Sequence, residues 1–235
     1  MTFKTLSKDD TARVAAVPLD YEWDSTIGNG FLAASDEEHP RLADAIEALN
    51  IHGAADLVIG GIEWCLARTQ AHVQAADGQL RLQAAWAGTV DLRYSALSEM
   101  PTDDLTVEDF WTRPELRARD FLEYMTSYMA QGRTAKVRQC ALGAVLLAEH
   151  LCGRDLAFGP WLVNMLRTKT ASSPRRPDDI DFNSRDRSLP EPQELTAPTR
   201  EERLAGLDPA TNPYLRSAAD MAALGFVGDP YPQLP

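Results

Sequence analysis

The strongest constraint on the fold is a run of nine residues without a polar side chain, residues 140–148. Charged residues flank the run on both sides. The run is far too short to cross a bilayer, which takes about 20 apolar residues. A helix that is apolar on every side must be surrounded by other helices. The sequence therefore predicts that residues 134–153 form the central helix of a helical protein.

Further helices are indicated by apolar residues at helical spacing, together with proline and glycine at the ends of segments. Pro40 and Pro114 suit the first turn of a helix, and residues 50–53 read as an interruption. Gly78 and Gly132 suit the end of a helix. The expected helices cover residues 41–50, 54–76, 79–97, 114–131 and 161–167. We predict an all-α fold, either a multi-helix bundle or an irregular stack of antiparallel helix pairs around the central helix.

The predicted main domain spans residues 1–170, and its first part is the least regular. Residues 1–38 mix aromatic side chains with turn-forming residues. Asn29-Gly30 is a dipeptide typical of tight hairpin turns. We therefore expect residues 1–38 to form an irregular N-terminal arm, with a short hairpin or an ordered segment packed on the helices.

The composition changes after residue 170. Residues 171–198 contain five prolines, ten charged residues and few large apolar ones, which predicts an extended, Pro-rich segment. Residues 199–235 are expected to form short helices docked on the main domain. Thr199 and Glu202 match a capping box before the first of them, and Asn212 is the expected cap of a second helix over residues 213–224.

The charge balance bears on the class of partner. The chain has 35 acidic and 23 basic residues, a net charge of −12, and acids outnumber bases both in residues 1–170 and in residues 171–235. Such a balance disfavours nucleic acid as a partner, because phosphate neutralisation needs clustered lysine and arginine. It favours association with a basic protein. Without a leader peptide or a long apolar segment, the chain is predicted to be cytoplasmic and not to bind membranes.

No catalytic or metal-binding motif stands out in the sequence. It lacks a phosphate-binding glycine loop, GxSxG, HExxH and an EF-hand loop. Cys65 with His72, and His150 with Cys152, offer metal-ligating atoms, yet their spacing matches no standard zinc site. We read the three cysteines as buried, reduced thiols and predict no catalytic residue, cofactor or metal.

Acidic clusters beside tryptophan offer a candidate partner-binding face. Acids that precede a helix also interact favourably with its dipole, and aromatic residues there are often core residues, so a purely structural role stays open. An acidic rim with an aromatic anchor nevertheless suits a basic protein. The candidate partner-binding residues are Asp36, Glu37, Glu38, Asp103, Asp104, Glu108, Asp109, Trp111 and Trp23.

Three functions are compatible with these features. The preferred hypothesis is an acidic immunity-type protein that neutralises a basic antibacterial toxin by direct binding and occlusion, which needs no catalytic residue. The second is a scaffold or assembly subunit whose C-terminal extension wraps a neighbouring chain. The third is a helical metal-binding protein or enzyme that uses Cys65, His72, Glu149 or His150.

Overall fold

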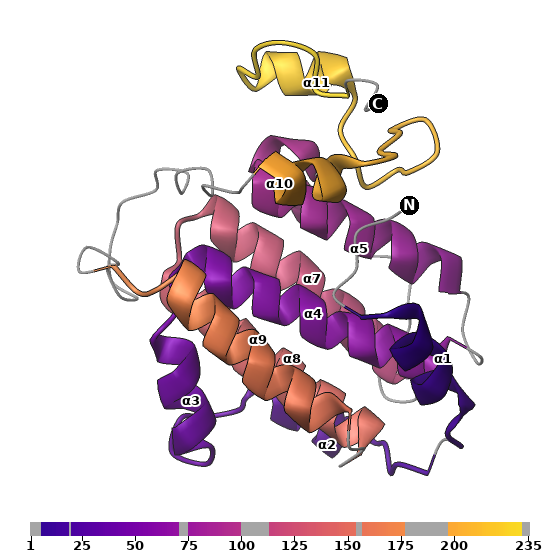
Figure 1. Ribbon diagram of the computed structural model, residues 1–235, viewed down its shortest axis with the longest axis vertical. Coiled ribbons are helices and arrows are strands. Elements are labelled where there is room, and N and C mark those ends of the chain that lie inside the picture. Colours follow the sequence, from indigo (N-terminus) through magenta and orange to yellow (C-terminus); the bar gives the residue numbers. More distant parts are fainter. Residues whose placement is uncertain are drawn as a thin grey trace.

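The computed structural model describes residues 6–18, 20–70, 75–99, 113–153, 157–176 and 197–231 (Figure 1). Within these ranges the chain is helical and forms no β-strand, only two isolated β-bridges. The all-α prediction is confirmed. The α-helices are α1 Lys8–Ala16, α2 Ser25–Leu32, α3 Pro40–Glu47, α4 Ile51–Thr69, α5 Ala75–Val90, α7 Pro114–Ala130, α8 Thr134–Cys152, α9 Phe158–Ser172, α10 Ala197–Leu204 and α11 Ala218–Ala223. Two 3₁₀ turns, η1 Leu92–Tyr94 and η2 Leu97–Glu99, follow α5.

The predicted central helix is α8, and it begins and ends where expected. Gly153 terminates it with a positive φ of 65°, a conformation that glycine adopts at little cost. Helices α4, α7, α8 and α9 run side by side through the body (Figure 1). The most extensive contact joins α4 to α8, where a Cβ on Gly61 would lie 3.2 Å from the carbonyl oxygen of Ala144. The missing side chain of Gly61 therefore allows the close approach of the two central helices.

Helix α4 is more central than its sequence indicated. Every one of its side chains except that of Leu66 is buried, although only one apolar line was predicted. It also begins at Ile51, three residues earlier than expected. Asn50 is its N-cap, because Asn50 Oδ1 accepts hydrogen bonds from the backbone N–H groups of His52 and Gly53. The residue read as an interruption thus starts the helix.

Other expected boundaries are also corrected. Helix α4 ends at Thr69, and Gly78 lies inside α5 instead of ending the preceding helix. A Cβ at Gly78 would meet the side chain of Leu66 at 3.0 Å, so the glycine serves packing. The expected short segment 161–167 is part of the longer helix α9.

The N-terminal segment is more regular than predicted. Two helices, α1 and α2, replace the expected irregular arm, and Asn29 and Gly30 lie in α2 instead of in a hairpin turn. Side-chain caps explain both helices. Ser7 Oγ accepts from the backbone N–H of Asp10, and Asp24 Oδ1 accepts from that of Ile27.

The C-terminal helices start at other residues than predicted. Helix α10 already begins at Ala197, so Thr199 lies within it. Helix α11 is capped by Ser217 and not by Asn212. The side chain of Asn212 instead donates to the carbonyl oxygen of Leu80, 2.9 Å away in α5. The apolar side expected of this helix comprised Leu215, Ala218, Ala219 and Ala222. Leu215 is buried, but the three alanines are exposed, and Met221 is buried instead.

Residues 197–231 pack on their own chain through the segment that follows α5. Ser95 and Leu215 form an antiparallel bridge. The hydroxyl of Tyr94 donates to the carbonyl oxygen of Pro230 at 2.6 Å, and its ring makes edge contacts with Phe226 and Tyr231. These contacts place α10 and α11 at one end of the body, opposite α2 and α3 (Figure 1). Residues 177–196 of the predicted Pro-rich segment lie outside the described residues, so the domain division stays a prediction.

Candidate functional site

The connector between α2 and α3 carries the first predicted acidic cluster. Asp36, Glu37 and Glu38 are all exposed there, whereas Ala34 is buried and anchors the segment. We call residues 33–39 the acidic connector. The connector joins α2 and α3 at the end of the body opposite α10 and α11 (Figure 1). The sequence-based expectation of an exposed acidic cluster is therefore met at these three positions.

A hollow of about 420 Å³ lies on one side of the acidic connector, between α3 and α8. We call it the α3 hollow. Its charges are mixed, because carboxylates and bases line it together. Arg138 is engaged within the protein, where Nε and a terminal guanidinium nitrogen donate to the carbonyl oxygen of Leu49 at 2.9 and 2.5 Å. Glu47 pairs with Arg138 and with Arg175. The charged residues that line the hollow are Asp36, Asp44, Glu47, Lys136 and Arg138.

A second hollow, of about 580 Å³, lies on the other side of the connector, between α2 and the end of α8. We call it the α2 hollow. Among the described residues that line it there is no lysine or arginine. Its charged residues are Glu38 and Glu149, for which the described part of the chain offers no ion-pair partner. The residues around it are Gly30, Phe31, Ala34, Glu38, His39, Leu146, Glu149, His150 and Gly153.

His150 joins this hollow to the segment before α2. Its Nε2 lies 2.7 Å from the carbonyl oxygen of Glu22. A carbonyl oxygen only accepts, so Nε2 donates, and in the neutral ring Nδ1 is then an acceptor. The rings of Tyr21, Trp23 and Phe31 surround the imidazole, with centroids 6.1, 6.2 and 5.5 Å away. The imidazole is thus held in place by a hydrogen bond and by aromatic packing.

Trp23, the predicted aromatic anchor, is used within the protein. Its ring is half-buried and stacks on that of Phe31, with centroids 6.2 Å apart and an interplanar angle of 20°. It also packs closely on Gly28, whose Cβ would lie 3.1 Å from the indole. Trp23 thus packs on Phe31, which lines the α2 hollow, whereas Trp23 itself is not part of the lining. The remaining predicted partner-binding residues, Asp103, Asp104, Glu108, Asp109 and Trp111, lie outside the described residues.

The cysteines considered as metal ligands are in the core. Cys65 is fully buried, and burial raises the pKa of its thiol well above the ordinary value. The thiol of Cys152 is 3.8 Å from the carbonyl oxygen of Trp64. His72 is outside the described residues. Within the described ranges, no group of three or more histidine, cysteine or acidic side chains is placed to hold a metal ion.

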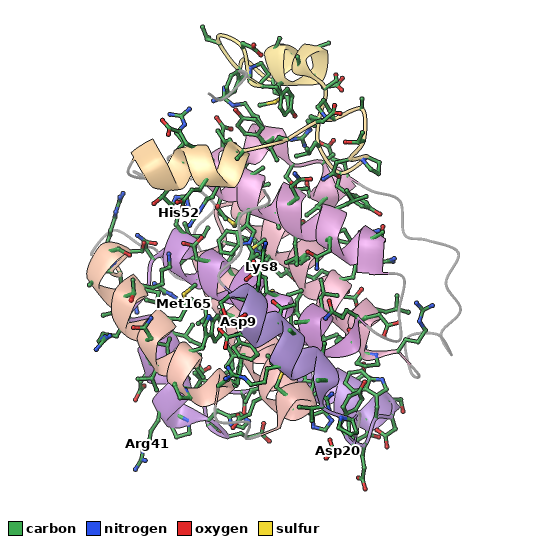
Figure 2. The ribbon with its side chains drawn as sticks, turned by 45° about the vertical axis from the view of Figure 1, so that its right-hand side comes forward. Lys8, Asp9, Asp20, Arg41, His52 and Met165 are labelled. Carbon is green, nitrogen blue, oxygen red and sulfur yellow. The ribbon has the colours of Figure 1, made fainter. Side chains whose placement is uncertain are left out.

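One charged cluster was not predicted at all. Asp56 in α4 is completely buried and contacts two bases, Lys169 of α9 at 2.5 Å and Arg203 of α10 at 2.9 Å. Burial alone would raise the pKa of Asp56, but Arg203 and Lys169 outweigh it and hold the pKa below its ordinary value. Arg203 also lies over the ring of Trp86, 4.8 Å from its centroid. In Figure 2, His52, one helical turn before Asp56, lies beneath α10.

A second buried acid, Asp120 of α7, is connected to α2 through Arg117. Asp120 pairs with Arg117 at 2.8 Å, and Arg117 also donates to the side chain of Asn29 in α2. Burial raises the pKa of Asp120 from 3.8 to about 6, although Arg117 acts in the opposite direction. Because the pKa in the folded state lies above that of the unfolded chain, this carboxyl favours folding at low pH. The stabilisation is lost as the pH rises from about 4 to about 6.

We therefore expect Asp120→Asn to raise the free energy of unfolding by roughly 2 kcal/mol at about pH 7.5, because the folded protein no longer has to bury the ionised Asp120 carboxylate. At about pH 3.5 the variant and the original chain should be equally stable. Urea denaturation at both pH values measures the difference. Asp44→Asn, at an exposed position of α3, is the control. A loss of stability for Asp120→Asn near neutral pH would contradict the expectation.

Comparison of the chain with family models, with curated proteins and with solved structures gives no match. The described helices include none that is both long enough and apolar enough to cross a membrane. The acidic connector and the two hollows beside it are the surface features of the described residues that bear on function.

Proposed function

We propose that this chain binds a basic protein through the acidic connector and the two hollows that flank it. The observation that carries the proposal is the exposure of Asp36, Glu37 and Glu38 between two concave surfaces. Side chains that protrude from a partner can enter the two hollows. The exposed carboxylates between the hollows complement lysine and arginine at the rim of such an interface. The net charge of −12 adds long-range attraction for such a partner.

Lys136, Arg138 and Arg41 are the described bases nearest the connector, and Lys136 Nζ donates to Gln139 Oε1 at 2.9 Å. Arg138 is buried and directed at the backbone of Leu49. Figure 2 shows Arg41 extending from α3 away from the bundle. Among the described residues, no base forms an ion pair with the three connector carboxylates. These carboxylates are therefore free to meet charges on a partner.

The more specific form of the proposal is an immunity-type function. An acidic protein that covers the basic surface of an antibacterial toxin blocks it by occlusion, which requires affinity and no catalytic group. The alternative function is an assembly subunit whose C-terminal extension wraps a neighbouring chain. The placement of residues 197–231 does not support this alternative. Tyr94 and Ser95 of the same chain already hold them.

Charge reversal on the connector tests the proposal. The chain is immobilised, exposed to a lysate of its native host, and the retained proteins are identified by mass spectrometry. We expect a basic protein to be retained by the original chain and lost from the double variant Asp36→Lys/Glu37→Lys, because like charges then face each other. Glu201→Lys/Glu202→Lys is the matched control, since it changes the charge equally on exposed positions of α10 at the other end of the body.

Growth of bacteria that express the captured protein tests the immunity function. Expression of that protein alone should stop growth, and co-expression of the original chain or of the α10 control should restore it. The connector variant should fail to restore growth. Retention of the same proteins by the connector variant and the original chain would contradict binding through the connector. If expression of the captured protein does not stop growth, the immunity function is wrong, but binding through the connector is not affected.

A further inference from the structure

We infer that the α2 hollow receives an arginine side chain of the basic partner. This inference rests on the proposed function and names the group that the hollow selects. The two hollows beside the acidic connector differ in their charges. The α3 hollow contains Lys136 and Arg138 besides its acids, whereas the charged residues among those described around the α2 hollow are Glu38 and Glu149. A cation is therefore favoured more strongly in the α2 hollow.

Aromatic and apolar groups in the same hollow favour a guanidinium over an ammonium ion. Phe31 and His150 line it with rings 5.5 Å apart, and Leu146 adds apolar surface. A guanidinium is planar, is weakly hydrated and stacks on aromatic rings, while its edge pairs with carboxylates. An ammonium ion is compact and strongly hydrated, so it gains less from the rings. The combination of two carboxylates with two rings thus matches arginine best.

The hydrogen bond made by His150 leaves one nitrogen of its ring as an acceptor. Its Nε2 donates to the carbonyl oxygen of Glu22 at 2.7 Å, which leaves Nδ1 of the neutral ring able to accept. A guanidinium carries five N–H donors and no acceptor, so an acceptor suits it. The volume of about 580 Å³ lies within the range of pockets that hold small ligands, about 300–1,000 Å³. One arginine side chain and part of its backbone therefore fit.

Titration of the whole chain with argininamide tests the inference, followed by NMR of the ring signals of His150 and Phe31. We expect saturable shifts at millimolar concentrations. Citrullinamide has nearly the same shape but lacks the guanidinium charge, so it should cause no saturable shift. Lysinamide should bind about threefold more weakly than argininamide. The variant Glu38→Gln/Glu149→Gln should weaken argininamide binding about fivefold, because two partly exposed ion pairs are lost. Asp36→Asn/Asp44→Asn in the α3 hollow should change it less than twofold.

Two results would overturn the arginine site: equal shifts with citrullinamide, or unchanged argininamide binding by Glu38→Gln/Glu149→Gln. If argininamide fails to bind while capture of the basic protein still requires Asp36 and Glu37, the arginine site is wrong and the proposed function stands. If argininamide binds as expected while charge reversal at Asp36 and Glu37 leaves capture unchanged, the connector proposal is wrong and the cation site stands. The two failures are thus distinguishable.

Discussion

Replacement of Asp56 by alanine is expected to lower the free energy of unfolding by about 3–5 kcal/mol. The side chain has no exposed surface and contacts Lys169 and Arg203 at 2.5 and 2.9 Å. Removal of this carboxylate takes away an ion pair from each of these two bases near the core. Since Arg203 retains only 2% of its side-chain exposure, it cannot reach water without displacing α10. The loss should therefore appear both as reduced stability and as detachment of α10.

Equilibrium unfolding in urea measures the first effect, and hydrogen exchange of the α10 amides measures the second. Asp44→Ala is the matched control, because Asp44 is an exposed aspartate on a helix, and it should change stability by less than about 0.5 kcal/mol. A loss below about 1 kcal/mol for Asp56→Ala would show that the buried ion pairs do not hold α9 and α10 on α4.

Gly143→Ala is expected to destabilise the protein by about 3 kcal/mol, at the upper end of the range for overpacking in a core. A Cβ at Gly143 would collide with the carbonyl oxygen of Phe31 and would lie 2.6 Å from the Cζ atom of Phe121. The first of these atoms belongs to the backbone of α2 and cannot rotate away. Helix α2 must therefore move off α8, and Phe31 moves with it out of the wall of the α2 hollow.

Gly159→Ala is the control for this substitution. A Cβ at Gly159 would meet no atom within 4 Å, and the residue lies in the first turn of α9. Alanine there should leave stability unchanged or raise it by up to about 1 kcal/mol, as helix propensity predicts. Chemical denaturation of both variants compares the two glycines. Equal stabilities for the two alanine variants would contradict the close contact of α2 with α8.

The parts of the fold that the sequence predicted well are those marked by strong local signals. Helix α8 combines a long apolar run with Gly153 at its end. Helices α3 and α7 begin at Pro40 and Pro114, whose missing N–H groups cost nothing in the first turn of a helix. Gly132, with a φ of 64°, follows α7 as expected. At these positions local chemistry and tertiary packing favour the same boundary.

Boundaries were mispredicted where one residue type serves two purposes. Asparagine both breaks helices and caps them, so Asn50 read as an interruption although it starts α4. Asn212 read as a cap, but its side chain instead donates to the carbonyl oxygen of Leu80, far away in the sequence. Asn29-Gly30 suits a hairpin turn, yet the cap at Asp24 and the packing on α8 keep it helical. A local cap therefore decided the structure at Asn50, a tertiary contact decided it at Asn212, and both acted on Asn29-Gly30.

The candidate site was only partly predictable for a similar reason. Three adjacent acids before a helix indicated exposed charge at Asp36, Glu37 and Glu38 without any structure. The hollows beside them require α2, α3 and α8 to meet, and periodicity does not show which helices become neighbours. The ion pairs of Asp56 connect helices that are far apart in the sequence, so no local pattern revealed them.

The most direct test of the proposed function is the rate constant for association with the captured basic protein, measured by stopped-flow fluorescence as salt is raised from about 50 to about 500 mM. Electrostatic attraction by the acidic connector predicts that the rate falls about tenfold or more over this range. Asp36→Lys/Glu37→Lys should slow association at low salt, whereas Glu201→Lys/Glu202→Lys should slow it much less. Two results would contradict binding through the acidic connector. One is an association rate constant that does not change with salt, and the other is an equal decrease of that rate constant at low salt in the two double variants.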